Sequence, residues 1–159
     1  MASAWRLVKT AYLSTAWNGE GAQRYGGRWN SPGVAVAYAS EHLSLACLEV
    51  LVAAHRGSDL DDFLATAADF HDIDVADLGD EPPSDWRSDT PPASTQAIGD
   101  AWVKRGATAI LRVPSVIVPV EYNYLINPAH PDARRIAIGK PMAFPFAARL
   151  RVPRRRPVD

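Results

Sequence analysis

Three segments of the chain show a clear pattern of apolar and polar positions. Residues 5–9 alternate between the two, as a strand with one buried face does, and the continuous apolar run at 34–39 predicts a buried strand. Ten of the twelve residues at 43–54 are apolar, which predicts a helix over about 41–56 that is buried on all sides. Ser40 precedes this segment and favours the N-cap position, so we place the start of the helix there.

The second half of the chain predicts one more helix and several short strands. A helix from 94 through about 104 ends at Gly106, a residue type that commonly closes helices. The segments that follow are short and divided mainly by prolines, and each predicts a strand: 108–114, 115–119, 121–127, 136–140 and 142–150. This order of elements predicts a single α+β domain.

Two regions carry no regular pattern. Residues 14–33 are rich in Gly, Ser and Asn and predict one long irregular segment, whose aromatic residues argue against disorder. Within 57–92, residues 64–70 fit either a strand or the end of a helix, and 75–86 predict a turn region. Because an ordered irregular segment of this length is usually functional, 14–33 is a candidate ligand-binding loop.

The size and charge of the chain limit its class. With 159 residues, 47% apolar and 22% charged, it has the composition of one ordinary globular domain. Its net charge of −1 gives no general attraction to nucleic acid or to an anionic membrane. The one cysteine, Cys47, forms no internal disulfide, and the sequence shows neither a signal peptide nor an apolar run long enough to span a membrane. We therefore expect a cytoplasmic protein that binds neither nucleic acid nor membrane.

Basic residues gather at the C-terminal end. We expect a domain over 1–150 and a basic tail over 151–159, which is either solvated or a docking patch for an acidic partner. The arginines of this end are Arg149, Arg151, Arg154, Arg155 and Arg156.

Two charged side chains stand out from their surroundings. Glu49 is the one charged residue of the apolar helix, so it lies either on a solvated stripe or at the floor of a pocket, where a carboxylate needs a partner. Arg28 lies in the glycine-rich stretch GGRWN, where backbone amides can approach an anion and a guanidinium fits phosphate. The alternative for Arg28 is a cation–π contact with Trp29.

Two further polar groups are candidates. Tyr38 closes the predicted strand and either stacks on a planar ligand or is a core tyrosine with a satisfied hydroxyl. Ser115 stands between a proline and an apolar run, and can hydrogen-bond Glu49 or a ribose hydroxyl; no GxSxG motif marks it as a nucleophile. The histidines lack metal-binding spacing, and no GxGxxG or phosphate-binding loop is present, so we expect no metal and no Rossmann cofactor site.

Four segments in this order resemble the RES domain family, which is named for an arginine, a glutamate and a serine. They are GGRWNSPG, VAYASEHLSLACLEVL, VPSVIVPVEYNYLINPAHPD and FPFAARL, and the resemblance runs from Trp5 to Leu150. One departure is the pair Ala147 and Ala148, at a segment where the family often carries an aspartate.

The resemblance places the family's polar residues on this sequence. Its arginine, glutamate and serine fall on Arg28, Glu49 and Ser115, its strand tyrosine on Tyr38, and a polar asparagine on Asn123. It implies an α+β fold like that of ADP-ribosyltransferases, with a split, strongly bent β-sheet core and flanking helices around an NAD⁺ cleft.

The same resemblance implies a function. RES proteins are toxins of bacterial type II toxin–antitoxin modules that consume NAD⁺ by hydrolysis or phosphorolysis, and some members ADP-ribosylate a protein instead. The implied partner is an Xre-like antitoxin whose C-terminal segment covers the active site, and we expect a toxin dimer within a larger complex. A nucleotide-binding or interaction module without turnover is the alternative.

Cleavage of the nicotinamide–ribose bond gives each residue an expected role, with NAD⁺ as substrate and no metal. Positive charge grows at the ribose carbon, so we expect the Glu49 carboxylate to stabilise it, with Ser115 orienting Glu49 or the ribose. We expect Tyr38 to stack on nicotinamide and Asn123 to contribute to NAD⁺ binding.

The glycine-rich loop has its own expected part in NAD⁺ binding. We expect Arg28 to clamp the pyrophosphate in the same cavity as Glu49, with Gly26 and Gly27 allowing close approach. Trp29 and Asn30 are expected to brace this loop rather than to touch the substrate.

Overall fold

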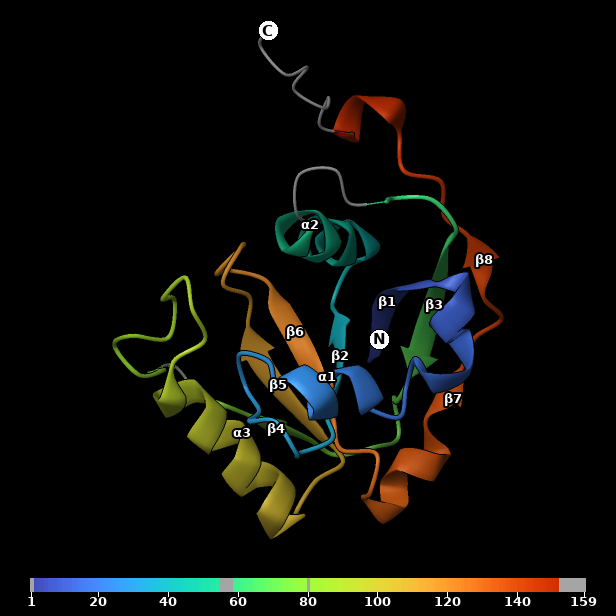
Figure 1. The fold of residues 1–159 in the computed structure, drawn as a ribbon. Helices are drawn as coiled ribbons and strands as arrows, with labels where there is room; N and C mark the ends of the chain where they lie inside the picture. Colours follow the sequence, from blue (N-terminus) through green and yellow to red (C-terminus); the bar gives the residue numbers. More distant parts are fainter. Residues whose placement is uncertain (1, 55–58, 80, 152–159) are drawn as a thin grey trace, which may run out of the picture.

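A computed structural model describes residues 2–54, 59–79 and 81–151. Its strands form one mixed sheet in the order β4-β5-β6-β2-β1-β3-β7, and β8 also pairs with β3 (Figure 1). The strands are β1 (Ser3–Lys9), β2 (Ala37–Ser40), β3 (Phe63–Asp69), β4 (Val75–Asp77), β5 (Ile110–Pro114), β6 (Tyr122–Ile126), β7 (Ala137–Ile138) and β8 (Met142–Ala143). Only the β4–β5 pairing among these is parallel.

The sheet is split between β1 and β2. Strand β1 pairs with β3 over seven residues, and β2 pairs with β6 over four. Between β1 and β2, by contrast, the one residue pair in register is Trp5 with Ser40. The expected α+β fold with a split, bent sheet is therefore confirmed, and the split leaves room beside β1 and β2 for a cleft.

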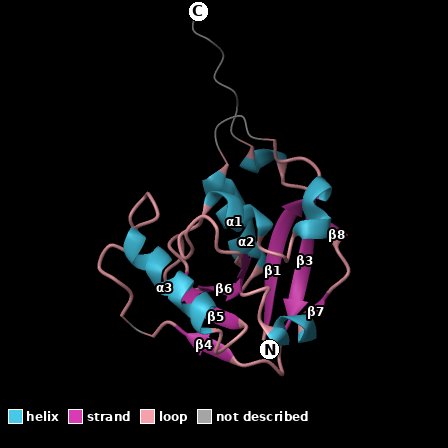
Figure 2. Ribbon diagram, turned by 60° about the horizontal axis from the view of Figure 1, so that its bottom comes forward, coloured by secondary structure: helices cyan, strands magenta, loops and turns pink. Residues whose placement is uncertain are grey.

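Three α-helices flank the sheet, as Figures 1 and 2 show. Helix α2 (Leu43–Ala53) lies across β1, and α3 (Ala93–Arg105) lies along the half that holds β4 and β5. The short α1 (Glu20–Tyr25) precedes β2 in the sequence. Turns of 3₁₀ helix occupy Thr10–Thr15, Pro131–Arg135 and Ala148–Leu150.

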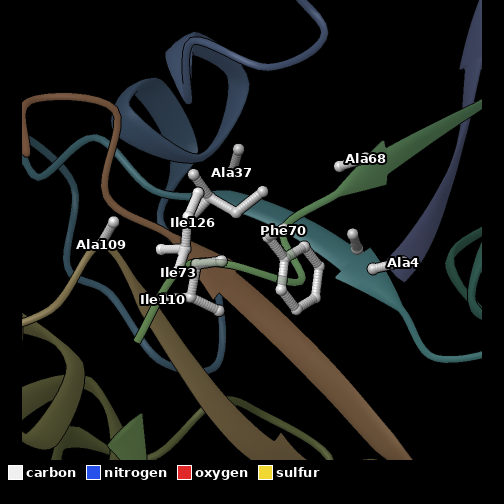
Figure 3. Close-up of a cluster of buried hydrophobic side chains, with 9 residues drawn as sticks. Ala4, Ala37, Ala68, Phe70, Ile73, Ala109, Ile110 and Ile126 are labelled. Carbon is white, nitrogen blue, oxygen red and sulfur yellow. The ribbon is translucent and has the colours of Figure 1, made fainter. Parts of the chain in front are cut away.

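The hydrophobic core joins the two halves of the sheet. One cluster of buried side chains contains Ala4 of β1 and Ala68 of β3 together with Ala37 of β2 and Ile126 of β6 (Figure 3). Phe70, directly after β3, is 2% exposed in the same cluster. Apolar burial therefore holds the halves together where backbone pairing is nearly absent.

Several sequence predictions are confirmed. Strand β1 contains residues 5–9, β6 lies within 121–127, and α3 covers the predicted second helix. Gly106 follows α3 with a left-handed φ of 64°, which is the conformation that makes glycine common at this position.

Other boundaries were wrong. The supposedly irregular segment 14–33 contains α1, whose six residues are too few to show a helical period. Residues 115–119 are not a strand, and 75–86 contains the three-residue strand β4. The strands predicted at 136–140 and 142–150 are reduced to the two-residue strands β7 and β8.

The environment of α2 also differs from the prediction. The helix begins at Leu43, and Ser40 is the last residue of β2 rather than the N-cap. Helix α2 is not buried on all sides: Leu48 is 40% and Val52 is 67% exposed, because only one face of the helix packs on the sheet. An apolar composition alone does not show which face a helix presents to its core. Residues 55 and 56 lie outside the described residues.

Candidate active site

A cavity of about 650 Å³ opens beside the split in the sheet. Its walls come from β1 and β2, from one face of α2, from the loop at 26–29 and from the segment that follows β5. This volume lies in the range of ligand-binding pockets. Arg28 and Glu49 both line it, so the prediction that they face one cavity is confirmed.

Glu49 is held in place by two side chains from the far half of the sheet. Asn123 of β6 donates from Nδ2 to Oε1 of Glu49 at 2.7 Å, and Ser115 donates from Oγ to the same oxygen at 3.3 Å. The carboxylate is half-buried and lines the cavity. Of the two alternatives for Glu49, the pocket is therefore the correct one, and its donors leave the second carboxylate oxygen free of any protein hydrogen bond among the described residues.

The Asn123 amide is itself held in one orientation. Ser40 donates from Oγ to Oδ1 of Asn123 at 2.8 Å, which turns the Nδ2 end of the amide toward Glu49. An ionised carboxylate can only accept hydrogen bonds, so the Asn123 amide has to present its Nδ2 donor, and not Oδ1, to Glu49. Ser40 and Asn123 are also directly opposite each other in the β2–β6 register.

Ser115 lies behind Glu49 rather than in the cavity. It is 0% exposed, and its Oγ accepts from the backbone N–H groups of Ile117 and Val118 at 3.1 Å each while donating to Glu49. The hydroxyl therefore uses its one donor and both acceptor positions. This geometry favours the orientation of Glu49 over direct contact with a ribose.

Arg28 lines the cavity from the loop at 26–29. Its Nη1 donates to the backbone oxygen of Trp86 at 3.0 Å. Burial lowers the pKa of Arg28, while the negative charges of Glu49 and Asp89 act in the opposite direction. The charge of Glu49 therefore acts on the Arg28 guanidinium within the same cavity. The alternative contact with Trp29 is not formed, because Trp29 is 3% exposed in a core cluster with Trp102 of α3.

The loop that carries Arg28 packs closely around Tyr38. A Cβ atom at Gly27 would lie 2.7 Å from the Tyr38 hydroxyl and 2.8 Å from Oδ1 of Asn30. Gly27 therefore allows the close approach of a tyrosine, in addition to any approach by a ligand. Asn30 is fully buried and donates from Nδ2 to the backbone oxygens of Ala22 and Val34, so it braces the loop as expected.

Helix α3 fixes the same loop from behind. Thr95 donates from Oγ1 to the backbone oxygen of Arg28 at 2.6 Å, and Gln96 donates from Nε2 to that of Gly27 at 3.1 Å. A Cβ atom at Gly99 would lie 1.5 Å from the backbone oxygen of Trp29, so helix and loop are in direct contact. The predicted α3 was not linked to the site, because nothing in its sequence shows what it packs against.

Tyr38 has a satisfied hydroxyl and a ring that lines the cavity. The hydroxyl donates to Oδ1 of Asn30 at 2.6 Å and accepts from the backbone N–H of Trp29 at 3.1 Å. Burial raises the pKa of Tyr38, so the hydroxyl stays protonated near neutral pH. The alternative of a tyrosine with a satisfied hydroxyl is therefore confirmed, and stacking on a planar ligand stays a prediction.

The residue that sequence reasoning missed is Arg6 of β1, which also lines the cavity. It is largely buried, and its Nη1 donates to the backbone oxygen of Tyr38 at 2.8 Å, across the split in the sheet. Burial lowers the pKa of Arg6. In the sequence it occupies a polar position of an alternating strand, which is indistinguishable from a solvated one.

Three further predictions concern what lies around the site. Ala147 and Ala148 are exposed and do not line the cavity. Within the described ranges, no group of three or more His, Cys, Asp or Glu side chains is placed to hold a metal ion. No helix in that part of the chain is long and apolar enough to cross a membrane. Residues 152–159 of the expected basic tail lie outside the described residues.

The fold defines the class of protein. It matches the crystal structure of the M. tuberculosis MbcT–MbcA toxin–antitoxin complex with a TM-score of 0.71, over 88% of this chain and 82% of that chain, at 22% identity. The chain therefore shares the α+β fold of that structure.

The sequence identifies the family. The model of the RES domain matches residues 3–147, and the chain belongs to this family. It is 38% identical to a Toxin Res of Yersinia enterocolitica, over 92% of this chain and 98% of that protein. It is 37% identical to a Prs ADP-ribosylating toxin of Sphingobium sp., over 93% and 96% of the two chains.

Proposed function

We propose that this protein is the toxin of a toxin–antitoxin pair and that it consumes NAD⁺ by cleaving the nicotinamide–ribose bond. The observation that carries the proposal is a carboxylate, Glu49, that is fixed by two donors and lines one cavity together with Arg28. Membership of the RES family supports the toxin function, and the similarity to the Prs ADP-ribosylating toxin of Sphingobium supports chemistry on NAD⁺.

Glu49 acts on the charge that develops in the reaction. As the bond to nicotinamide breaks, its electron pair leaves with the ring, which becomes neutral, and positive charge grows on the ribose carbon. A negative charge already fixed beside that carbon stabilises this state without rearrangement. Asn123 and Ser115 are positioning residues in this scheme, because both bind Glu49 rather than the reacting atoms.

The other cavity residues bind the rest of the substrate. Arg28 holds the pyrophosphate, since its guanidinium carries N–H groups beyond the one that binds Trp86. The ring of Tyr38 stacks on nicotinamide, and Gly27 lets Tyr38 approach the loop. Nicotinamide is a good leaving group, so this scheme requires no general acid.

The incoming nucleophile is water or phosphate in this proposal. A second candidate is a protein side chain, which would make the protein an ADP-ribosyltransferase. The similarity to the ADP-ribosylating toxin of Sphingobium favours this second candidate. The two share every step up to loss of nicotinamide and differ only in what attacks the ribose carbon.

The test is a time course of NAD⁺ with nicotinamide, ADP-ribose and phosphorylated products separated, with and without phosphate. Glu49→Gln keeps the size of the side chain and removes its charge, and we expect it to abolish nicotinamide release. Glu81→Gln is the matched control, because Glu81 is exposed and does not line the cavity. Wild-type rates in Glu49→Gln would refute the proposal, and NAD⁺ binding without nicotinamide release would instead favour a module without turnover.

We propose an Xre-like antitoxin as the partner, with its C-terminal segment covering the cavity, and a toxin dimer within the complex. The similarity of the fold to a chain of the MbcT–MbcA toxin–antitoxin complex supports an antitoxin partner. Val52 lines the cavity, and exposed Leu48 lies one turn away on α2, so an apolar surface adjoins the opening. Leu48→Asp should then weaken copurification with the antitoxin, whereas Val75→Asp, at an exposed position of β4, should not.

A further inference from the structure

Tyr25 is an exposed aromatic side chain at the rim of the cavity. It is the last residue of α1, it is 78% exposed, and it lines the cavity that also holds Arg28 and Glu49. Each residue that follows it as far as Trp29 lines the same cavity. Tyr25 therefore begins a continuous stretch of cavity wall that includes the Arg28 guanidinium.

The part of α1 that precedes Tyr25 is apolar and leaves room in front of it. Gly21 and Ala22 lie about one helical turn before Tyr25, and both line the cavity. A Cβ atom at Gly21 would meet nothing within 4 Å, so this part of the wall is open. The three residues carry no charged side chain, and the tyrosine hydroxyl is their one polar side-chain group.

The backbone oxygen of Ala22 is not free to bind the amino group of a nucleotide base. It already accepts two hydrogen bonds, from the N–H of Gly26 at 2.8 Å and from Nδ2 of Asn30 at 2.9 Å. A carbonyl oxygen has two acceptor positions, so both are occupied. The face of the Tyr25 ring remains available to a ligand, and an aromatic ring stacks on any planar base without regard to its polar edge.

The position of Tyr25 along the chain suits one end of a dinucleotide. Arg28 follows it by three residues, which span at most about 11 Å. Tyr38, the ring expected beside nicotinamide, binds the loop after Arg28, through the N–H of Trp29 and Oδ1 of Asn30. With the pyrophosphate at Arg28, one aromatic ring precedes the phosphate position in the sequence and the other binds the residues that follow it.

We propose that Tyr25 stacks on the adenine base of the bound dinucleotide and that Gly21 and Ala22 leave the space in which this base lies. The subsite selects a planar ring system and does not distinguish the polar groups at its edge. Packing does not account for the ring at this position, because a side chain this exposed buries little apolar surface. The inference rests on the proposed function for the identity of the ligand, whereas the open apolar wall is a property of the chain.

The first experiment compares steady-state cleavage of NAD⁺ by wild type, Tyr25→Ala and Tyr25→Phe. Loss of the ring should raise KM at least about fivefold, the lower end of what stacking of one base contributes. It should leave kcat nearly unchanged, because the bond that breaks lies beside Glu49. Tyr25→Phe keeps the ring and should have the wild-type KM. Tyr12→Ala is the matched control, since Tyr12 is 64% exposed and does not line the cavity.

A substrate analogue tests whether the edge of the base is recognised. In etheno-NAD⁺ an extra ring covers the amino edge of adenine and leaves the base planar. We expect wild type to cleave it with a KM no more than about threefold above that for NAD⁺, because stacking tolerates the change. A larger increase would show that the protein reads this edge and would overturn the proposal.

Gly21→Leu tests the space in front of α1 without removing the ring. A Cβ atom at this position is unobstructed and leucine favours a helix more than glycine does, so the variant should unfold at a temperature no lower than wild type. Its side chain extends into the space assigned to the base, so KM for NAD⁺ should rise while kcat stays nearly unchanged. A folded Gly21→Leu variant with the wild-type KM would place the base elsewhere.

Calorimetry with ADP-ribose separates this subsite from the proposed function. Suppose that ADP-ribose binds Tyr25→Ala at least about fivefold more weakly than wild type, and that wild type releases no nicotinamide from NAD⁺. That result would contradict the proposed function and leave the base subsite in place. The same KM for NAD⁺ in Tyr25→Ala and wild type would overturn the subsite and leave the proposed function in place.

Discussion

Asn123 donates to Glu49 across 2.7 Å, although 74 positions separate them in the sequence. The bond connects β6, which lies on the other side of β2 from β1 in the sheet, with the helix that packs against β1. The position of the Glu49 carboxylate therefore depends on β6, a strand that follows α2 only after a long stretch of sequence.

Loss of the Asn123 amide should lower the rate of cleavage more than the affinity for NAD⁺. Asn123→Ala leaves Glu49 with the 3.3 Å bond from Ser115 alone, and we expect kcat to fall on the order of 10- to 100-fold. Steady-state kinetics with NAD⁺ measures this. Ser40→Ala should lower kcat by less, and should have no further effect in the Asn123→Ala background, because Ser40 acts through Asn123. An equal additional loss in the double variant would contradict this link.

Ser115→Ala should reduce stability as well as activity. It removes the acceptor of two backbone N–H groups in a fully buried position, which destabilises by about 1–3 kcal/mol for each group left without a partner. Chemical unfolding of the purified variant measures the loss. Ser88→Ala is the control, since Ser88 is exposed and its hydroxyl donates to the backbone oxygen of Asp85, three residues away. A variant with unchanged stability would show that water replaces the hydroxyl.

Three glycines should respond differently to alanine. Gly99→Ala places a Cβ atom 1.5 Å from the backbone of Trp29, so it should separate α3 from the loop and destabilise strongly. Gly27→Ala should displace Tyr38 and raise KM for NAD⁺. Gly21→Ala meets nothing within 4 Å and should stabilise α1 by up to about 1 kcal/mol. Unfolding curves of the three variants should follow this order, and a tolerated Gly99→Ala would refute the contact.

Tyr38→Phe should change the alkaline limb of the stability curve. Burial raises the pKa of Tyr38 in the folded state above its usual value of 10.0, so above that pH the unfolded chain loses a proton that the folded one keeps. Stability from this group is therefore present below pH 10.0 and is lost as pH rises beyond it. The variant should be less stable at neutral pH, since Asn30 and Trp29 lose their partner, and should show a flatter alkaline decline. A decline equal to that of wild type would contradict this assignment.

The sequence predicted those parts of the site whose residue type is unusual for its surroundings. Glu49 stands alone in an apolar helix and Arg28 lies among glycines, so both could be found without a fold. The helix α3 and those strands that are long enough to show a period of apolar and polar residues were also predicted. Asn123 and Ser115 came from the resemblance or from their position, and their common partner became visible only in three dimensions.

What could not be predicted depends on pairing between distant segments. Strand β4 has three residues and exists because it pairs in parallel with β5. Ser40 has the sequence context of an N-cap residue, but its hydroxyl donates to Asn123 on the neighbouring strand of the β2–β6 pair. Arg6 has the pattern of a solvated position, and only the split in the sheet makes it a cavity residue.

The Asn123–Glu49 hydrogen bond determines how late in the synthesis of the chain the site can be completed. A chain that is still being made and ends before residue 123 carries Glu49 without its closest donor, and without most of the strand β6 that pairs with β2. The enzyme proposed here would therefore complete its site only after more than three quarters of its 159 residues have been joined. A toxin built in this way is inactive for most of its own synthesis, which gives a partner time to be present when the cavity first forms.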